Sequence, residues 1–474
     1  MFKHTKIVAT IGPATSEETT LKDLMESGVS VFRLNFSHGD LENKALLIKR
    51  IRNVSKQLQQ AVAILGDLQG PKIRVGLLKN GTMTLTPGAE VIITSQEILG
   101  EDNLIPTVYK NLPQDVQSGD QILLDDGLME LEVLEVQGED VRCKVRFGGT
   151  LKDRKGINLP GVAVSAPSLT EKDKEDLQFC IEQEIDYLAL SFVRRATDVL
   201  ELKAQLKENN SLIKVISKIE KPEAVENFDS ILAATDGVMV ARGDLGVEIR
   251  PEKVPLIQKE IIRKCNNVGK PVITATQMLE SMINNPRPTR AETSDVANAI
   301  LDGTDAIMLS AETASGKYPL EAVKLMDCVA RDVEQAALSK PKQFQALDNQ
   351  QGLDLSETIG QSACRIAQSV GAKAILAFTQ TGNTAALVAK YRPAMPIYAV
   401  TPSRAVRRRL ALYSGVQSLR VDLQGDTEEQ VEQVEKSVLD AGVLQPGDVV
   451  VITMGSPVSE PGTTNLLKVH QLVS

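Results

Sequence analysis

Short apolar runs bounded by turn residues recur along the first two thirds of the chain. Most are rich in Val and Ile or continuously apolar, which is the pattern of strands buried on both faces. Segments with helical periodicity, such as TEKDKEDLQFCIEQ and VPLIQKEIIRKCNNV, lie between most of them. The runs are KIVATIG, VSVFRLNFS, VAILGDLQG, YLALSFV, KVISKIE, GVMVARGD, PVITATQM and AIMLSAET. Eight alternations of strand and helix predict an α/β fold, the (β/α)₈ or TIM barrel.

The interval between the third and fourth runs departs from this alternation. It holds short alternating segments (TMTLTPG, EVIITS, QILLDDG, LMELEVLEV and VRCKVRF) and many Gly-containing turns. Such a pattern is typical of an all-β domain, which we expect over residues 71–166. The barrel would then comprise residues 1–70 and 167–336, a length close to the ~250 residues usual for this fold.

A third domain is predicted after PKQFQALDNQQGLDLS, a polar stretch with the composition of a linker. The runs AILAFT, PIYAVT, VQSLRV and DVVVITMG alternate with helical segments. They indicate an α/β domain with a mainly parallel sheet over residues 337–474.

The loop TQTGNT of this domain is a candidate anion site. It places hydroxyls and backbone amides between a strand and a helix, where they can hold a phosphate. A polar N-cap on an ordinary helix would account for the same residues. The loop consists of Thr379, Gln380, Thr381, Gly382, Asn383 and Thr384.

Composition narrows the class of protein. The 474 residues are too many for one ordinary core, and 42% apolar with 24% charged residues is typical of a globular protein. A net charge of -9 argues against a nucleic-acid binder, and we expect the short cluster Arg407, Arg408, Arg409 to be a solvated helix face. No run approaches the ~18 apolar residues of a membrane span, and the N-terminus lacks a signal core, so we expect a cytoplasmic protein.

The five cysteines are scattered and never form a CxxC pair. This spacing suits reduced thiols better than disulfides or a zinc site. They are Cys143, Cys180, Cys265, Cys328 and Cys364.

Polar residues gather at the ends of the apolar runs of the predicted barrel. Barrels of this kind carry their active sites at the C-terminal ends of the strands. Buried charge without a partner would cost several kcal/mol, so groups converging on one mouth call for a ligand or a metal. The residues are Arg33, Asn35, Ser37, Asp67, Lys218, Glu220, Asp244, Thr276, Ser310 and Glu312. Taken singly, Thr276 and Ser310 also fit a structural role.

Lys218 and Glu220 form the most informative pair. Side chains alternate across a strand, so these two point the same way, and Asp244 follows the next run. Two carboxylates beside an ammonium favour a divalent-metal site with a cation next to it. An isolated Lys/Glu pair is more often a surface salt bridge.

Nine longer stretches carry a resemblance to a known family. They are TKIVATIGPA, VFRLNFSHG, GDLQGPKIR, KGINLPG, ISKIE, VMVARGDLGVEI, ITATQMLESM, NPRPTRAE and DVANAILDGTDAIMLSAETASGKYP. They cover the predicted barrel in order, with the β insertion and the C-terminal domain in the family's positions. On these motifs the chain resembles the pyruvate kinases of bacterial type. The resemblance implies phosphoryl transfer from phosphoenolpyruvate to ADP, giving pyruvate and ATP in the last step of glycolysis.

The resemblance also implies roles for the residues of the mouth. Glu220 and Asp244 would hold Mg²⁺ or Mn²⁺, whose preference for hard oxygen ligands they satisfy. Lys218 and Arg33 would stabilise the charge of the transferring phosphoryl group. Backbone amides of Ala241, Arg242, Gly243 and Asp244 would receive the substrate carboxylate. Thr276, with Ser310 and Glu312, would form a water-mediated proton relay.

The inserted domain would close over the nucleotide and a second Mg²⁺. The nucleotide-binding residues implied by the resemblance are Arg74, Lys155, Asn35 and His38. Closure would exclude water that otherwise consumes the phosphoryl group.

One position departs from many members of the family. Those members bind K⁺ through residues matching Asn35, Ser37, Asp67 and Leu68, and carry a glutamate where this chain has Lys72. A lysine ammonium can supply the positive charge that K⁺ brings, and GPKIR resembles the K⁺-independent branch. We therefore expect that K⁺ is not required.

Regulation and assembly follow from the resemblance alone. The loop Thr379–Thr384 matches the family's effector loop, and the absence of Trp leaves a sugar monophosphate or AMP open as effector beside fructose-1,6-bisphosphate. Arg404, Arg407 and Lys468 are candidates for a second anion contact. A position on the solvated surface would also account for each of them. We expect a homotetramer, with Arg287 and Arg290 in an inter-subunit region.

Two other functions fit part of the same sequence pattern. A Mg²⁺-dependent enolate lyase or aldolase on a related barrel would use similar residues, but would not need a nucleotide-covering β domain. A catalytically silent sensor would have lost one of Lys218, Glu220, Asp244 or Thr276, and all four are present.

Overall fold

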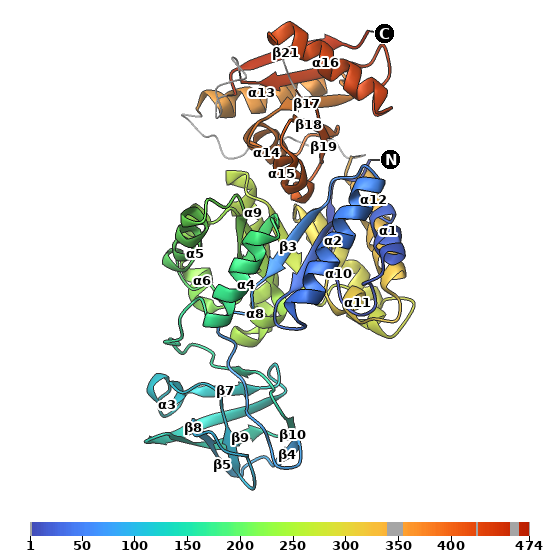
Figure 1. Ribbon diagram of the computed structural model, residues 1–474. Coiled ribbons are helices and arrows are strands. Elements are labelled where there is room, and N and C mark those ends of the chain that lie inside the picture. Colours follow the sequence, from blue (N-terminus) through green and yellow to red (C-terminus); the bar gives the residue numbers. More distant parts are fainter. Residues whose placement is uncertain (1, 339–353, 423–424, 456–463, 474) are drawn as a thin grey trace.

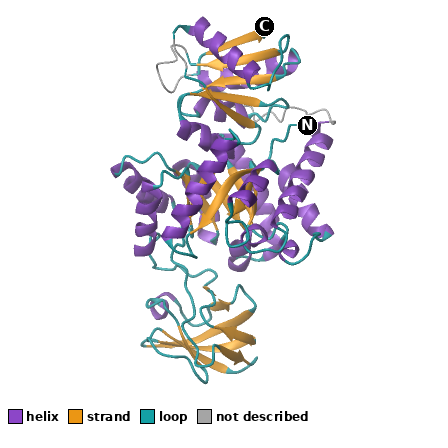
Figure 2. Ribbon diagram, turned by 45° about the vertical axis from the view of Figure 1, so that its right-hand side comes forward, coloured by secondary structure: helices purple, strands orange, loops and turns teal. Residues whose placement is uncertain are grey.

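The computed structural model describes residues 2–338, 354–422, 425–455 and 464–473. Three bodies follow one another along the long axis of the molecule (Figure 1). The β-rich inserted domain lies at one end, the barrel in the middle and the C-terminal α/β domain at the other end. Strands form the centre of the barrel and helices surround them (Figure 2).

Eight parallel strands close the barrel in the order β1-β16-β15-β14-β13-β12-β3-β2. Strand β1 pairs with both β2 and β16, which completes the ring. Every predicted run became a strand, and the predicted fold class is confirmed. The strands are β1 (Lys6–Thr10), β2 (Val29–Asn35), β3 (Ala63–Asp67), β12 (Tyr187–Leu190), β13 (Lys214–Ile219), β14 (Gly237–Ala241), β15 (Val272–Ala275) and β16 (Ala306–Leu309).

The alternation of strand side chains divides the barrel core into two layers. Ile7, Leu188 and Val238 point outward and pack with the helices, whereas Val8 and Met239 fill the interior. The surrounding helices are α1 (Glu18–Glu26), α2 (Leu41–Gln57), α4 (Glu171–Glu182), α5 (Ala196–Glu208), α6 (Pro222–Glu226), α7 (Phe228–Ala234), α8 (Arg242–Glu248), α9 (Val254–Val268), α10 (Arg290–Leu301), α11 (Ala311–Ala314) and α12 (Pro319–Leu338), with short 3₁₀ turns η1 (Pro251–Lys253) and η2 (Glu280–Ile283).

The inserted domain has a hydrophobic core of its own. A six-stranded sheet runs in the order β11-β7-β8-β9-β5-β6, and β10 pairs with β4. Its elements are β4 (Thr82–Leu85), β5 (Glu90–Thr94), β6 (Leu104–Pro106), α3 (Leu112–Asp115), β7 (Gln121–Leu124), β8 (Met129–Gln137), β9 (Asp140–Phe147), β10 (Gly149–Lys152) and β11 (Ile157–Asn158). The one-turn helix α3 is its only described departure from an all-β composition. The boundaries 70/71 and 166/167 stay predictions.

The C-terminal domain is built on a sheet of order β19-β18-β17-β20-β21, in which only β21 is antiparallel. This confirms the mainly parallel sheet; β21 was not predicted. Its elements within the described residues are α13 (Leu355–Ser369), β17 (Ala374–Phe378), α14 (Asn383–Lys390), β18 (Ile397–Thr401), α15 (Arg404–Arg409), η3 (Leu410–Leu412), β19 (Val416–Arg420), α16 (Thr427–Asp440), β20 (Val449–Met454) and β21 (Leu466–Gln471). Most of the predicted linker PKQFQALDNQQGLDLS lies outside the described residues.

The C-terminal domain closes the barrel at the N-terminal ends of its strands. Ala411 and Leu412 of η3 belong to the core inside the barrel. Just before them, Arg408 Nε lies 2.7 Å from Asp186 Oδ1. Arg407 donates to the Gln59 carbonyl at 2.6 Å, and Arg409 donates to the Leu212 carbonyl at 2.9 Å.

The expectation of a solvated face for Arg407, Arg408 and Arg409 was therefore wrong. All three side chains are partly buried and bind the base of the barrel. Burial also lowers the pKa of Arg407. A charge run on a short helix cannot reveal from sequence which domain it faces.

Arg392 makes a second ionic contact between the two domains. Its guanidinium binds Asp305 through two bonds, Nη1 to Oδ1 at 2.7 Å and Nη2 to Oδ2 at 2.9 Å. Nη2 also donates to Asn266 Oδ1 at 2.6 Å. Asp305 is 3% exposed, so its charge depends on this partner.

We expect the substitution Arg392→Met to lower the free energy of unfolding by about 3 kcal/mol, because it leaves a buried carboxylate uncompensated. Urea denaturation followed by circular dichroism would measure the change. Arg420→Met is the matched control, since Arg420 pairs with the exposed Asp422 at 3.4 Å. Equal losses for the two variants would contradict the assigned role of Arg392.

Candidate active site

The candidate residues converge on the C-terminal ends of the barrel strands, at the end that faces the inserted domain (Figure 1). Arg33 and Asn35 lie in β2, Asp67 ends β3, and Lys218 lies in β13. Glu220 directly follows β13, Asp244 lies in the first turn of α8, and Thr276 and Ser310 follow β15 and β16. The predicted location at the strand ends is therefore what the fold produces.

Lys218 lies at the centre of a buried ionic cluster. Its Nζ is 2.8 Å from Glu220 Oε1 and 3.3 Å from Asp67 Oδ1, and it donates to Ser191 Oγ at 2.8 Å. Arg33 binds the other oxygen of Asp67, with Nε 2.6 Å from Oδ2. The side chains of Lys218 and Arg33 are each 12% exposed. Two cations thus share two buried carboxylates.

The cluster determines the charge state of each member. Burial alone would lower the pKa of Lys218, but Asp67, Glu220 and Asp244 outweigh it and raise that pKa above its usual value. Burial would raise the pKa of Asp67, but Lys218 and Arg33 outweigh it and lower that pKa. Lys218 is therefore a permanent cation and Asp67 a permanent anion at neutral pH.

Of the two buried carboxylates bound to Lys218, Glu220 has its negative charge less fully balanced by neighbouring cations. Burial raises its pKa more than Lys218 lowers it, and Asp244 raises it further. Its Oε2 accepts the Phe192 amide at 2.7 Å. Its Oε1 is buried and, despite the nearby ammonium, has no properly oriented hydrogen-bond donor among the described residues.

The donor set fits a divalent ion. A buried oxygen of Glu220 that accepts no oriented hydrogen bond, together with the nearby Asp244 carboxylate, supplies hard ligands of the kind Mg²⁺ takes. No group of three or more His, Cys, Asp or Glu residues within the described part of the chain could hold a metal alone. Two carboxylates suit Mg²⁺, which keeps several waters and also binds phosphate oxygens of substrates.

Thr276 is held in a strained backbone conformation. Its φ is 69° and that of Gln277 is 54°, a left-handed region that a β-branched residue rarely adopts. The Thr276 hydroxyl donates to the Ala275 carbonyl at 2.6 Å and accepts the Gly243 amide at 2.7 Å. A Cβ on Gly243 would lie 3.3 Å from that hydroxyl, so the close approach favours glycine.

Arg242 turns its side chain away from the mouth. The guanidinium binds Asp295 of α10 through two bonds of 2.7 and 2.6 Å, and donates to the Thr276 carbonyl at 2.8 Å. Only the backbone of Arg242 remains toward the mouth, in keeping with the backbone role expected for it.

Glu312 connects the loops after β15 and β16. Oε2 accepts the Ser310 amide at 2.7 Å and Oε1 accepts the Leu279 amide at 3.1 Å, while burial raises the Glu312 pKa. No hydrogen bond joins Thr276 to Ser310 or Glu312 in the described structure. The three-residue relay stays a prediction.

The inserted domain joins the barrel through two segments, residues 68–74 and 159–170, which we call the hinge. The expected nucleotide residues lie within it or on either side of it. Arg74 donates to the Arg154 carbonyl at 3.2 Å, and Lys155 pairs with Asp125 at 2.8 Å in the inserted domain. On the barrel side, Asn35 Oδ1 accepts the Ser37 amide at 3.0 Å.

His38 lies in a cationic neighbourhood. Burial lowers its pKa, and the charges of Arg74, Lys44, Lys72 and Arg33 lower it further. His38 is therefore neutral at physiological pH, while the cations around it favour an anion such as a polyphosphate.

The residues of the expected monovalent-cation site are already engaged. Asp67 binds Arg33 and Lys218, and the Leu68 carbonyl accepts Ser191 Oγ at 2.8 Å. Lys72 extends beside Gly156, and no ion pair joins it to Asp67 or to any other described carboxylate. The structure does not bring Lys72 and Asp67 together.

Thr10 and Ser191 complete the cluster but were not predicted. Arg33 Nη1 donates to Thr10 Oγ1 at 3.1 Å, and Ser191 contacts Lys218. Thr10 ends β1 and Ser191 directly follows β12, so the rule that found the other strand-end residues applies to them too.

The candidate effector loop leads into helix α14. Gly382 has φ of 100° at the N-cap of α14, and its amide donates to Thr379 Oγ1 at 2.8 Å. The Asn383 amide reaches Thr381 Oγ1 at 3.4 Å, and Thr384 Oγ1 lies 3.0 Å from Thr464 Oγ1. The N-cap residue of α14 is a glycine without a side-chain cap, so the polar N-cap of the alternative is not formed, and an anion at the loop stays a prediction.

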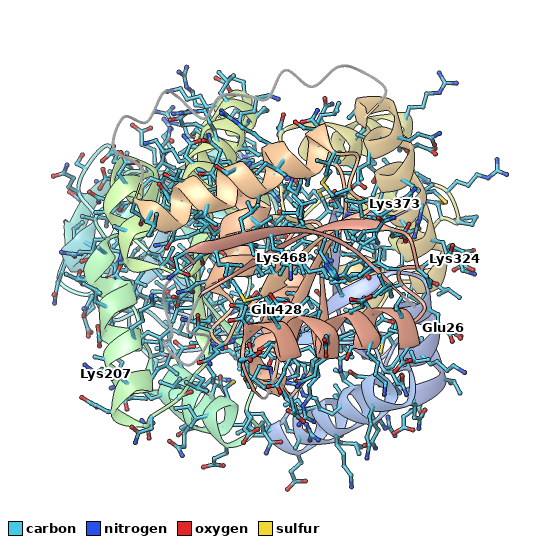
Figure 3. All side chains as sticks on the ribbon, turned by 90° about the horizontal axis from the view of Figure 1, so that it is seen from above. Glu26, Lys207, Lys324, Lys373, Glu428 and Lys468 are labelled. Atoms are coloured by element: carbon cyan, nitrogen blue, oxygen red, sulfur yellow. The ribbon has the colours of Figure 1, made fainter. Side chains whose placement is uncertain are left out.

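Two of the three candidates for a second anion contact already have partners within the protein. Arg407 binds the barrel base, and Lys468 of β21 lies 3.2 Å from Glu428 of α16 on the face turned away from the barrel (Figure 3). Arg404 is exposed.

All five cysteines are free, and only Cys328 is exposed. Within the described residues, no helix is long and apolar enough to cross a membrane.

The fold and this mouth define a barrel enzyme with carboxylates beside a buried cation at the strand ends. Comparison with known proteins specifies the class. Residues 2–323 match the family "Pyruvate kinase, barrel domain" and residues 357–470 match "Pyruvate kinase, alpha/beta domain".

Full-length relatives agree. The chain is 50% identical to the pyruvate kinase of Bacillus licheniformis over 472 residues, which is 99% of this chain and 80% of the relative. It is 50% identical to that of Geobacillus stearothermophilus over 473 residues, with the same coverage. A crystal structure of a pyruvate kinase from Cryptosporidium parvum superposes with a TM-score of 0.93 at 40% identity, covering 99% of this chain and 96% of that one.

The chain belongs to the pyruvate kinase family of phosphotransferases, as its motifs predicted. The lyase or aldolase alternative is not supported. Divalent metal is the cofactor of this family, and phosphoenolpyruvate and ADP are its substrates.

We expect Lys218→Met to lower kcat by about 10²–10³-fold, the usual effect of removing one electrostatic contact to a transition state. Binding of Mn²⁺ should persist, because the substitution removes a cation that competes for Glu220. Steady-state kinetics and electron paramagnetic resonance would measure the two effects. Lys214→Met, at the exposed start of the same strand, is the control. Loss of Mn²⁺ binding together with activity would contradict the separate roles of Lys218 and Glu220.

Proposed function

We propose that the barrel mouth carries out the transfer from phosphoenolpyruvate to ADP with the residue roles expected above. The observation that carries the proposal is the buried cluster Asp67–Lys218–Glu220, in which the charge of Asp244 also acts on Glu220. Glu220 and Asp244 would hold Mg²⁺, or Mn²⁺ in its place. When bound, the ion neutralises charge on the phosphoryl oxygens of the substrate.

Lys218 and Arg33 stabilise the phosphoryl group as it moves. Both cations are preorganised by Asp67, so little side-chain reordering accompanies the reaction. Because phosphoryl transfer needs positioning and charge stabilisation more than covalent chemistry, this pair supplies what the step requires.

The Gly243 amide and Thr276 act in sequence on the substrate. A substrate carboxylate that accepts from the amides of Ala241–Asp244 takes over the Gly243 N–H, which now donates to Thr276 Oγ1. The freed hydroxyl of Thr276 then orients a proton donor toward the enolate carbon. Ser310 and Glu312 supply the proton through water, a role supported by the raised pKa of Glu312.

The nucleotide binds between the mouth and the inserted domain. Arg74, Asn35 and His38 contact it from the hinge and barrel, and Lys155 approaches when the domain closes. The cationic neighbourhood of His38 supports this placement. Closure then excludes water from the phosphoryl group.

Lys72 makes the reaction independent of K⁺. Its side chain lies beside Gly156 and contributes to the positive potential at His38, at the junction between mouth and inserted domain. No ion pair joins its ammonium to a described carboxylate, so its charge contributes to the field that the substrates meet. The effect would be through the field at the site rather than through direct contact with Asp67.

Regulation and assembly complete the proposal. A sugar monophosphate or AMP would bind the loop Thr379–Thr384, where hydroxyls gather at the start of α14. The homotetramer would use the region of the exposed residues Arg287, which precedes α10, and Arg290, which begins it. A cytoplasmic location is part of the same proposal.

Pyruvate formation from phosphoenolpyruvate and ADP with Mg²⁺ tests the function directly. We expect equal turnover with K⁺ and with Na⁺. Lys72→Glu should make the enzyme depend on K⁺ by about tenfold or more, because a carboxylate then replaces the fixed cation. Lys152→Glu, an exposed position in the inserted domain, is the control. A tenfold stimulation of the unaltered enzyme by K⁺ would refute the role of Lys72, and no pyruvate in any buffer would refute the function.

A further inference from the structure

A second buried ionic cluster lies behind the mouth, where the inserted domain returns to the barrel. Glu248 at the C-terminal end of α8 binds Lys221, with Oε1 2.6 Å from Nζ. The same oxygen accepts Asn158 Nδ2 at 2.8 Å. The Glu248 side chain is 1% exposed and that of Lys221 is 12% exposed. None of these three residues belongs to the site described above.

The cluster is adjacent to both proposed metal ligands. Glu248 lies four residues after Asp244 in α8, so the two carboxylates lie on the same face of the helix, one turn apart. Lys221 directly follows Glu220. Glu248 is therefore one helical turn from Asp244. It also binds the residue that directly follows Glu220 in the chain.

Asn158 brings the inserted domain into the same cluster. It is the last residue of β11, which pairs with β7 in the large sheet of that domain. It also lies three residues after Lys155, the expected nucleotide contact. Any rotation of the inserted domain about its hinge displaces Asn158 relative to Glu248.

A few residues after Asn158, the barrel holds the segment that returns from the inserted domain. Arg194 donates to the carbonyls of Val164 and Ala166, the latter at 2.7 Å. The returning segment is thus fixed to the barrel at Val164 and Ala166, and to α8 at Asn158. The intervening residues 159–163 lie between a barrel anchor and a contact that must follow the inserted domain.

The hinge has room for a small displacement. A cavity of about 30 Å³ is lined by Lys72 and Asn158, where the chain enters and leaves the inserted domain, and by Lys221 of the barrel. Glu248 Oε2 is also buried and has no hydrogen-bond partner among the described residues. A buried carboxylate oxygen without a donor is costly and calls for an explanation. A donor that arrives as the hinge moves would provide it.

We propose that Glu248 is a positioning residue that couples the orientation of the inserted domain, through Asn158, to the arrangement of Glu220 and Asp244. The inference rests on the proposed roles of those two carboxylates as metal ligands. Metal and substrate at the mouth would favour one orientation of the inserted domain, and nucleotide-driven closure would in return favour the metal-binding arrangement. Such coupling between two sites is reciprocal by thermodynamic necessity.

Substitution of Asn158 separates coupling from stability. Asn158→Ala removes the contact to the inserted domain but leaves the Lys221–Glu248 ion pair in place, so no buried charge loses its ionic partner. Asn158→Gln restores the amide donor, and the neighbouring cavity accommodates one added methylene. Asn103→Ala, an exposed asparagine of the inserted domain, is the matched control.

The measurement is the distance between the inserted domain and the barrel in the full chain. Spin labels on Cys328 of α12, the exposed cysteine, and on a cysteine introduced by K152C on β10 report it by pulsed electron resonance. Mg²⁺ with phosphoenolpyruvate, without ADP, is the probe. We expect it to shift the distance distribution in the labelled parent and in N103A. The shift should fall by about fivefold or more in N158A and return in N158Q.

A kinetic readout distinguishes positioning from a merely structural role. In N158A, the KM for Mg²⁺ should rise by about fivefold or more, while kcat at saturating Mg²⁺ stays within about twofold. A full distance shift in N158A, or none in the parent, would overturn the coupling. Glu220→Gln separates the two proposals: if it abolishes the shift while N158A does not, the metal site stands and the coupling fails. If Glu220→Gln leaves Mg²⁺ dependence and the shift unchanged, the assigned metal site itself fails.

Discussion

The sharing of two buried carboxylates by Lys218 is the interaction on which the catalytic end of the molecule depends. Any one of these charges left alone in the barrel mouth would cost several kcal/mol. Asp67 is balanced by Lys218 and Arg33, whereas Glu220 keeps an oxygen without an oriented donor. The cluster is stable as it stands and still has ligand capacity to offer. Arg33 and Asp67 are far from Lys218 and Glu220 in sequence, so only closure of the barrel brings the two pairs together.

The two ends of the barrel have separate tasks. At the N-terminal ends of the strands, Ala411 and Leu412 fill the interior, and Asp186 and Asp305 each receive an arginine from the C-terminal domain. That end is closed by hydrophobic packing and ion pairs. The chain enters and leaves the inserted domain at the other end, so the same end provides both the ligand groups and the element that covers them.

The sequence predicted those features that depend on local pattern. The strands buried on both faces appear as continuous apolar runs, and the rule that places polar groups at strand ends located Asp67, Lys218 and Glu220. What it could not give depends on partners distant in sequence. The side of α15 that meets the barrel, the bond between Arg242 and Asp295, and the position of Lys72 away from Asp67 all follow from packing between segments. Strand β21 was missed because none of its residues is fully buried, so LLKVHQ lacks the apolar run that marks the other strands of the sheet.

Helix α8 joins the two ionic clusters of the catalytic end. It follows β14 directly, which fixes Asp244 at its start, and Asn158 and Lys221 fix Glu248 at its end. A helix of seven residues with both ends held has little freedom to bend. Under the proposed coupling, a displacement of Glu248 would be passed to Asp244 along this short helix rather than absorbed by bending. The shortness of α8 is thus a physical reason why a residue outside the mouth could influence the geometry of the proposed metal ligands.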